Sequence, residues 1–458
     1  MRSDAQRLAD AGEVLAGEER ERSQNAVYVV YVAVIAAGAY GVPAAQALLR
    51  FVDPEWLASH LGGLRGVLLG AAVLVAALAL AYRLGRVRGP VVPPLPYLDI
   101  VAASPIDRAL VLRPWWRLGL FGCLVGGLLI GLVIGAGLAI YALASAWVLL
   151  PAVGVGTVVG LLVAGSWLHG QVRGWPTGSR GSGVFLRQRR SLRALHLTAL
   201  RTQAASAVTV GGAVLAGDLR AARLDVGSRT TRGRRWRLRA FGRTSVMVAR
   251  DWLGLRRTAG AGAAGLLLVL AGTYALVQSA TPGTPSIIAL AGLLLAYLGV
   301  SAWSEGLRLQ GDNAGTPPLL GLDPSAEATA HLVLPGVGYV VTVLVVGGLS
   351  VLFAHATVVG ILWALLMTGL LLAAQLMAAF RGLPPAGIFS PNAGVPIMVL
   401  WYSVPLLVPA VCGTAASAFL SAGQTTTAVV VLALTTWFAL LYARRRTRVL
   451  FQQHRAAD

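Results

Sequence analysis

Long apolar runs alternate with short polar segments along most of the chain. About 20 apolar residues are needed for a helix to cross the hydrocarbon core of a membrane, and ten runs approach or exceed that length. The ten runs cover residues 26–49, 66–82, 118–141, 143–168, 260–280, 286–303, 336–353, 357–380, 395–420 and 426–442. The pattern predicts an all-α, polytopic integral membrane protein with about ten transmembrane helices.

A further apolar stretch, 204–217, is shorter than the others and lies in the most arginine-rich part of the chain. Its length and flanks favour a cytosolic or interfacial helix over a span. The spans then form two blocks of four and six. The expected segments are an interfacial N-terminal segment (1–25), a first transmembrane block (26–168), a basic cytosolic segment (169–258), a second transmembrane block (259–443) and a basic tail (444–458).

The distribution of arginine predicts the orientation. The chain has a net charge of +20, with 12% charged and 56% hydrophobic residues. Its cations are all arginine, and they cluster between apolar runs rather than along one soluble face, which argues against nucleic-acid binding. With both termini in the cytoplasm, every arginine except Arg50 and Arg65 falls on the cytoplasmic side, as the positive-inside rule requires.

Composition adds a location and a lipid partner to this picture. The bias toward Arg, Ala, Gly and Val is typical of a high-GC bacterial genome, so we expect the plasma membrane of a bacterium. The basic core of the middle segment, residues 229–239, could attract anionic lipid headgroups. The alternative is an ordinary solvated loop on the positive side of the membrane.

The two blocks repeat one order of parts. In each, a pair of spans leads into a cytoplasmic loop of about 30 residues (83–117 and 304–335), and a closely spaced helix pair follows. Each loop holds adjacent prolines and then a capping residue before a proline, a sequence that starts a helix. The capping pair is Ser104 and Pro105 in the first loop, and Asp323 and Pro324 in the second.

Each loop is therefore expected to carry a short helix that stops at a proline, Pro114 or Pro335, just before the next span. The charged side chains expected to face the cytosol are Asp107, Arg108, Glu327 and His331. Residues 243–257 precede the second block as an amphipathic helix suited to the membrane interface. The N-terminal segment 2–22 holds the equivalent place before the first block.

This arrangement resembles the permease subunits of ABC-2-type exporters, in particular permease-like membrane proteins of actinobacteria. The resemblance implies an interfacial elbow helix before the first span, and short coupling helices that contact a separate ATPase subunit. The candidate coupling residues are Ser104, Pro105, Asp107 and Arg108 in the first loop, and Asp323 and Glu327 in the second. The family half-unit has six spans, whereas the first block here has four.

The sequence lacks the residues that an ATPase site or a zinc-protease site requires. The phosphate-binding loop of an ATPase needs a lysine, and the sequence contains none. The six histidines are scattered without a zinc-protease motif. We therefore expect no enzyme activity, metal or cofactor in this chain, and an ATPase supplied in trans.

Small residues recur every fourth position in the third span. Gly127, Gly131 and Gly135 form the centre of this ridge, which predicts close helix packing. The alternatives are a seam between identical subunits, and hence a homo-oligomer, or the lining of a path for an apolar substrate. The leading hypothesis is a permease subunit for a hydrophobic or amphipathic cargo. The alternative is a non-transporting, degenerate permease that acts as a membrane scaffold or regulator.

Overall fold

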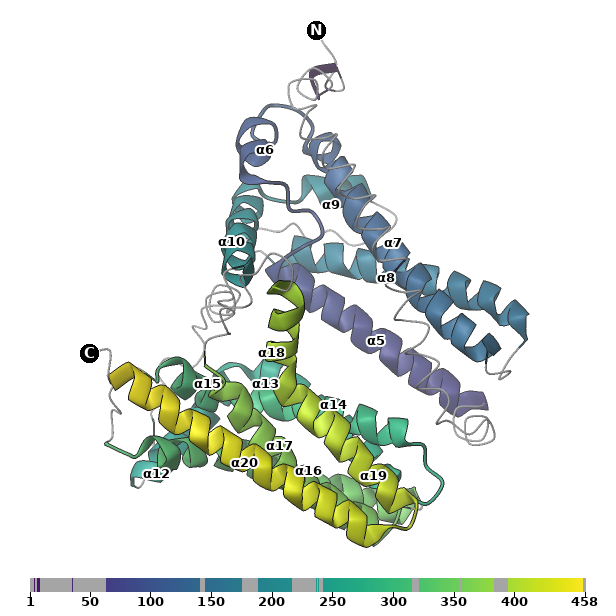
Figure 1. Cartoon of the computed structure of the whole chain (residues 1–458). Helices are drawn as coiled ribbons and strands as arrows, with labels where there is room; N and C mark the ends of the chain where they lie inside the picture. The colour runs from purple at the N-terminus through teal and green to yellow at the C-terminus, as the bar shows by residue number, and fades with distance from the viewer. Residues whose placement is uncertain are drawn as a thin grey trace. The chain divides into compact units, whose positions relative to one another are not determined.

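A computed structural model describes most of the chain as helices (Figure 1). The described residues are 63–140, 145–174, 188–215, 242–314, 321–354, 356–382 and 394–455, with isolated positions at 4, 6–8, 35, 236 and 238. These ranges contain helices, turns and irregular segments, and no strand. The chain divides into two compact units, Met1–Gly227 and Ser228–Asp458.

The described part of unit 1 holds three helices that are long and apolar enough to span a membrane, and three others. The long helices are α5 (Gly63–Val87), α7 (Arg108–Ile140) and α8 (Leu149–Arg173), with the 3-10 turn η2 (Ala146–Val148) before α8. The others are α6 (Leu95–Ile100), α9 (Gln188–Arg193) and α10 (Leu197–Leu215). Helix α10 contains most of the apolar stretch 204–217, and it does not qualify as a membrane span.

The described part of unit 2 holds six membrane-length segments. They are α13 (Ala259–Ser279), α14 (Ser286–Trp303), α16 (Pro324–Phe353), α17 (Val358–Ala379), the run α18 (Gly394–Val408), η4 (Pro409–Gly413) and α19 (Thr414–Ser421), and finally α20 (Thr425–Arg455). Two shorter helices, α12 (Arg243–Arg257) and α15 (Glu305–Asp312), lie outside the spans. The turn η4 is one turn of π-helix, which keeps α18 and α19 in one continuous segment.

Nine helices in the described ranges are long and apolar enough to cross a membrane. They coincide with nine of the ten runs predicted from the sequence, so the chain is an all-helical, multi-pass membrane protein. The predicted first span, 26–49, lies outside the described residues apart from Ile35. The amphipathic helix predicted over 243–257 is α12, with the same bounds.

Two predictions about the loop helices are wrong. Neither ends at its proline, because α7 continues through Pro114 and α16 continues through Pro335. A proline inside a helix removes one backbone hydrogen bond, and neighbouring helices in a membrane bundle compensate for such a loss. Each loop helix is therefore the first part of a spanning helix. At 1.5 Å per residue, the 33 residues of α7 reach about 50 Å, beyond the ~30 Å hydrocarbon core.

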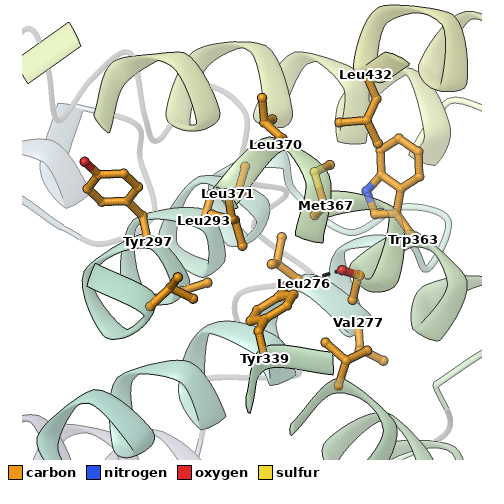
Figure 2. Close-up of a cluster of buried hydrophobic side chains, with 14 of the residues drawn as sticks. Leu276, Val277, Leu293, Tyr297, Tyr339, Trp363, Met367, Leu370, Leu371 and Leu432 are labelled. Atoms are coloured by element: carbon orange, nitrogen blue, oxygen red, sulfur yellow. Dashed lines mark hydrogen bonds between the residues drawn. The ribbon is translucent and has the colours of Figure 1, made fainter. Parts of the chain in front are cut away.

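The core of unit 2 is apolar and forms where the spans cross. Figure 2 shows Leu276, Val277, Leu293, Tyr297, Tyr339, Trp363, Met367, Leu370, Leu371 and Leu432 in this core, contributed by α13, α14, α16, α17 and α20. Glycines bring α13 and α14 together: a Cβ on Gly272 would lie 2.5 Å from the backbone nitrogen of Ala296. Small residues at such crossings let backbones approach closely, which is how helices gain packing energy in lipid.

Candidate functional site

A buried cluster of charged and polar side chains joins α12 to α16 in unit 2. Nδ1 of His331 lies 2.6 Å from Oδ2 of Asp251, and the two side chains are 0% and 4% exposed. A guanidinium nitrogen of Arg250 lies 3.4 Å from the other ring nitrogen of His331. If Nδ1 donates its proton to Asp251, Nε2 can accept from Arg250, so one neutral tautomer satisfies both contacts.

Two further residues close around this pair. Oε1 of Glu327 lies 3.9 Å from Nε2 of His331, one helical turn back along α16. Helix α15 contributes Gly306, where a Cβ would lie 1.9 Å from a carboxylate oxygen of Asp251. Only a glycine leaves room for the carboxylate here. The cluster therefore fixes α12, α15 and the first turns of α16 to one another.

This geometry corrects the expectation that His331 faces the cytosol, because its side chain is completely buried. The side chain of Glu327 is also largely covered, with 14% exposed. Asp323 is the N-cap of α16 as predicted, and its carboxylate accepts a hydrogen bond from the backbone nitrogen of Ser325 at 3.0 Å. The Ser325 hydroxyl also bonds that carboxylate, and these bonds lower the pKa of Asp323 below its usual value.

In unit 1, the start of α7 is held by an arginine clamp, defined here as Asp107, Arg189 and Arg193. The guanidinium of Arg193 donates to both oxygens of Asp107, at 2.9 and 2.6 Å, and Arg189 donates at 2.9 Å. The same carboxylate accepts from the backbone nitrogen of Ala109 at 3.1 Å, so it also caps the helix. The Arg193 hydrogen bonds, with the one from Arg189, hold the pKa of Asp107 well below its usual value.

The first loop thus differs from its prediction in two ways. The helix begins at Arg108, with Asp107 as its cap. Ser104 and Pro105 lie before it in a bend, where the Ser104 hydroxyl donates to the Val101 carbonyl at 2.6 Å. Arg108 donates to the carbonyl of Leu195 at 3.0 Å. Asp107 and Arg108 are therefore occupied by contacts within unit 1 instead of facing the cytosol freely.

Buried glutamines were not recognised in the sequence as structural residues. Gln171 of α8 pairs with the backbone of Val91, accepting from its nitrogen at 3.3 Å and donating to its oxygen at 2.8 Å. It also donates to Gln203 of α10 at 2.8 Å. In unit 2, Gln375 of α17 donates to the Tyr297 carbonyl at 3.1 Å. In both units a glutamine near the end of a span ties that helix to a neighbouring backbone.

The glycine ridge of α7 faces α8. A Cβ on Gly127 would lie 2.2 Å from the carbonyl oxygen of Gly156, and one on Gly131 would lie 2.3 Å from that of Ala152. At Gly135 the nearest atom would be the Ala152 Cβ, at 2.9 Å. The structure thus uses these glycines for packing within one chain.

Neither polar cluster has the parts of a catalytic centre. Each consists of carboxylates with arginine or histidine partners, without a nucleophile beside a base. Within the ranges that the structure describes, no three His, Cys, Asp or Glu residues gather where they could hold a metal ion. The clusters serve to join helices electrostatically. No protein-family model, curated protein or solved structure matches the chain.

Proposed function

We propose that the chain is the membrane-spanning permease subunit of an ATP-driven, ABC-type exporter whose ATPase is a separate polypeptide. One observation carries the proposal. In each unit a short helix, α6 or α15, lies between two spans and precedes a helix, α7 or α16, that is longer than the membrane is thick. A rigid helix that starts in water and continues through the bilayer can transmit a displacement made at its exposed end.

The proposed topology has ten spans in blocks of four and six, with both termini in the cytoplasm of a bacterium. The tenth span would be 26–49. The loops before α7 and α16, helix α12 and the end of α20 would then share the cytoplasmic side, which places nearly all the arginines there. An ATPase subunit, which needs cytosolic ATP, would meet the chain on this side.

The proposed cargo is hydrophobic or amphipathic. Ionisable groups inside a membrane are costly and mark the pathways of ions and protons. The apolar parts of the nine described spans lack Asp, Glu and Arg, apart from residues near their ends. A lipid-like or apolar peptide-like molecule suits such a path better than an ion.

The surface proposed to meet the ATPase includes an apolar tip. At the end of α6, Ile100 is 69% exposed although it lies outside the spans. Ala103 and Pro105 beside it are also exposed. Because Asp107 and Arg108 are bonded within unit 1, this apolar tip is our candidate in the first loop for the contact with a partner.

Site-specific photo-crosslinking tests the proposal. A crosslinking amino acid at position 100 should capture, in the native membrane, a polypeptide that binds ATP and carries a phosphate-binding loop. The matched control is position 147: Trp147 is 77% exposed but lies in η2, between α7 and α8 at the other end of these spans. Capture of the same ATPase at both positions, or of no ATPase at position 100, would count against the permease role.

A second candidate function is a non-transporting scaffold or regulator. It is favoured because the charged groups of both clusters are bonded within the chain. Both the arginine clamp and the His331–Asp251 pair use their charges inside the chain. Purified complexes separate the two: a permease should retain vanadate-sensitive ATP hydrolysis on purification from its own membrane, whereas a scaffold should retain none.

A further inference from the structure

Two arginines converge at the end of unit 2 where α17 ends and α20 leaves its apolar part. Arg381 lies two residues after the end of α17 and donates to the Tyr402 carbonyl of α18 at 3.0 Å. Its guanidinium carbon also lies 4.5 Å from the centre of the Tyr402 ring. Arg446 of α20 donates to the backbone oxygen of Arg381 at 2.5 Å, and its guanidinium carbon lies 5.9 Å from the Trp401 ring. Three elements thus bring together two cations and two aromatic rings.

The backbone turn after α17 is shaped for this approach. Gly382 has a φ of 77°, a left-handed conformation that favours glycine. A Cβ on Gly382 would also lie 3.1 Å from Nη2 of Arg446. The turn points the Arg381 carbonyl at Arg446 while leaving space for that guanidinium.

Among the described residues, the two guanidiniums have partners for few of their donors. Each arginine carries five N–H donors, and each makes one hydrogen bond within the described part of the chain, to a carbonyl. No carboxylate forms an ion pair with either arginine among the described residues, and the neighbouring segment 383–393 contains no acid. The Trp401 indole N–H is buried and has no hydrogen-bond partner in the described structure.

Burial lowers the pKa of Arg381, which means that its charge is only partly solvated. Tyr297, Tyr402 and Asp312 favour that charge and Arg308 disfavours it, but burial has the largest effect. A partly desolvated cation with free donors gains most from a bound anion.

We propose that Arg381 and Arg446 bind the headgroup of an anionic phospholipid. The phosphodiester would accept hydrogen bonds from both guanidiniums, and its acyl chains would lie along the spans α17, α18 and α20. Three features favour a lipid over a soluble phosphate. The site lies between spans at the level where they end, Trp401 and Tyr402 have the side chains enriched at membrane interfaces, and basic pockets between transmembrane helices bind such headgroups.

Lipid titration of the purified full-length protein tests the site. Native mass spectrometry in detergent would count phosphatidylglycerol and phosphatidylcholine molecules bound to wild type, to Arg381→Gln with Arg446→Gln, and to a control, Arg444→Gln with Arg445→Gln. The control removes the same charge from exposed positions on α20. Because each lost charge-assisted bond weakens binding by about tenfold or more, the site variant should lose at least tenfold in phosphatidylglycerol affinity. The control should lose less than about threefold.

Three results would overturn the proposal. Equal affinity of wild type and the site variant would exclude these arginines. An equal loss in the control would show that net charge alone attracts the lipid. Inorganic phosphate that binds as tightly as phosphatidylglycerol would exclude the lipid as the ligand. The variant Arg381→Lys with Arg446→Lys keeps both charges, so it should fold. Its affinity for phosphatidylglycerol should nevertheless be lower than that of wild type, because lysine cannot donate in a planar fork.

Discussion

Replacement of His331 by alanine should be among the most destabilising single changes in unit 2. It leaves Asp251, whose side chain is 4% exposed, as a buried carboxylate without its closest partner. A buried polar group left without its hydrogen-bond partner costs about 1–3 kcal/mol, and a buried charged group costs more. Thermal unfolding in detergent should show this loss, and the double variant Asp251→Ala with His331→Ala should lose less than the sum of the two single variants.

An exposed pair in the same unit is the control. Oε2 of Glu305 lies 3.9 Å from Nη1 of Arg308, and the Glu305 side chain is 54% exposed. Glu305→Ala should therefore cost no more than about 1 kcal/mol. A His331→Ala variant as stable as this control would show that the buried cluster does not hold α12 and α16 together.

Asp107 should give the start of α7 a stability that depends on acid pH. Its lowered pKa means that the carboxylate is stabilised in the folded state, so its contribution is complete above the ordinary value of about 3.9 and is lost as pH falls below it. Asp107→Asn keeps a capping side chain but removes the charge. The stability difference between wild type and this variant, about 1 kcal/mol, should be constant from pH 8 to 5.

The same difference should then shrink between about pH 4 and pH 3, as measured by denaturant or thermal unfolding at each pH. A difference that is equally large at pH 3 and pH 7 would mean that the arginine clamp does not depend on the Asp107 charge.

These residue contacts could not be predicted from the sequence. His331 and Asp251 are 80 positions apart, and Asp107 and Arg193 are 86 apart, so no local spacing indicates either pair. One signal was present: Asp251 is the only acid in the basic helix 243–257, and it lies four residues after Met247 on the face that is buried. The prediction of an amphipathic helix over 243–257 does not depend on this acid.

At the scale of elements, the crossing of α7 and α8 depends on glycine. Gly127→Ala should push the helices apart, because its Cβ would lie 2.2 Å from the Gly156 carbonyl oxygen. Overpacking of this kind costs about 1–3 kcal/mol. A Cβ on Gly126 would have no atom within 4 Å. Gly126→Ala should therefore be neutral, or slightly stabilising because alanine has the higher helix propensity. If thermal unfolding shows equal effects for both variants, the close crossing is not a source of stability.

Element boundaries were predictable where local chemistry sets them. The periodic arginines and apolar positions define α12, and Asp323 before Pro324 defines the start of α16. The start of α7 was misplaced because Ser104 before Pro105 is an equally good cap in the sequence, whereas the contact of Asp107 with α9 decides between them. The prolines Pro114 and Pro335 do not end their helices, because packing in the bundle outweighs the lost hydrogen bond.

At the scale of the whole molecule, hydropathy predicted nine spans that the structure contains. Length and apolar composition suffice for this because a membrane imposes one length on every crossing helix. The division into Met1–Gly227 and Ser228–Asp458 was not predictable in this form, since it places α9 and α10 with the first spans and α12 with the later ones. Those assignments depend on tertiary contacts such as Gln171 with Gln203.

The proposed topology places the arginine-bearing ends of the spans in the cytoplasm. Accessibility of single cysteines in intact cells measures this directly, in a background with Cys123→Ala and Cys412→Ala. Ala103→Cys and Thr244→Cys lie at the arginine-bearing ends of units 1 and 2, and Ser145→Cys and Gln424→Cys lie at the opposite ends; all four positions are exposed. An impermeant thiol reagent should label positions 145 and 424 in intact cells, and positions 103 and 244 only after lysis. Labelling of position 103 or 244 in intact cells would place the proposed ATPase surface outside the cell and contradict the account.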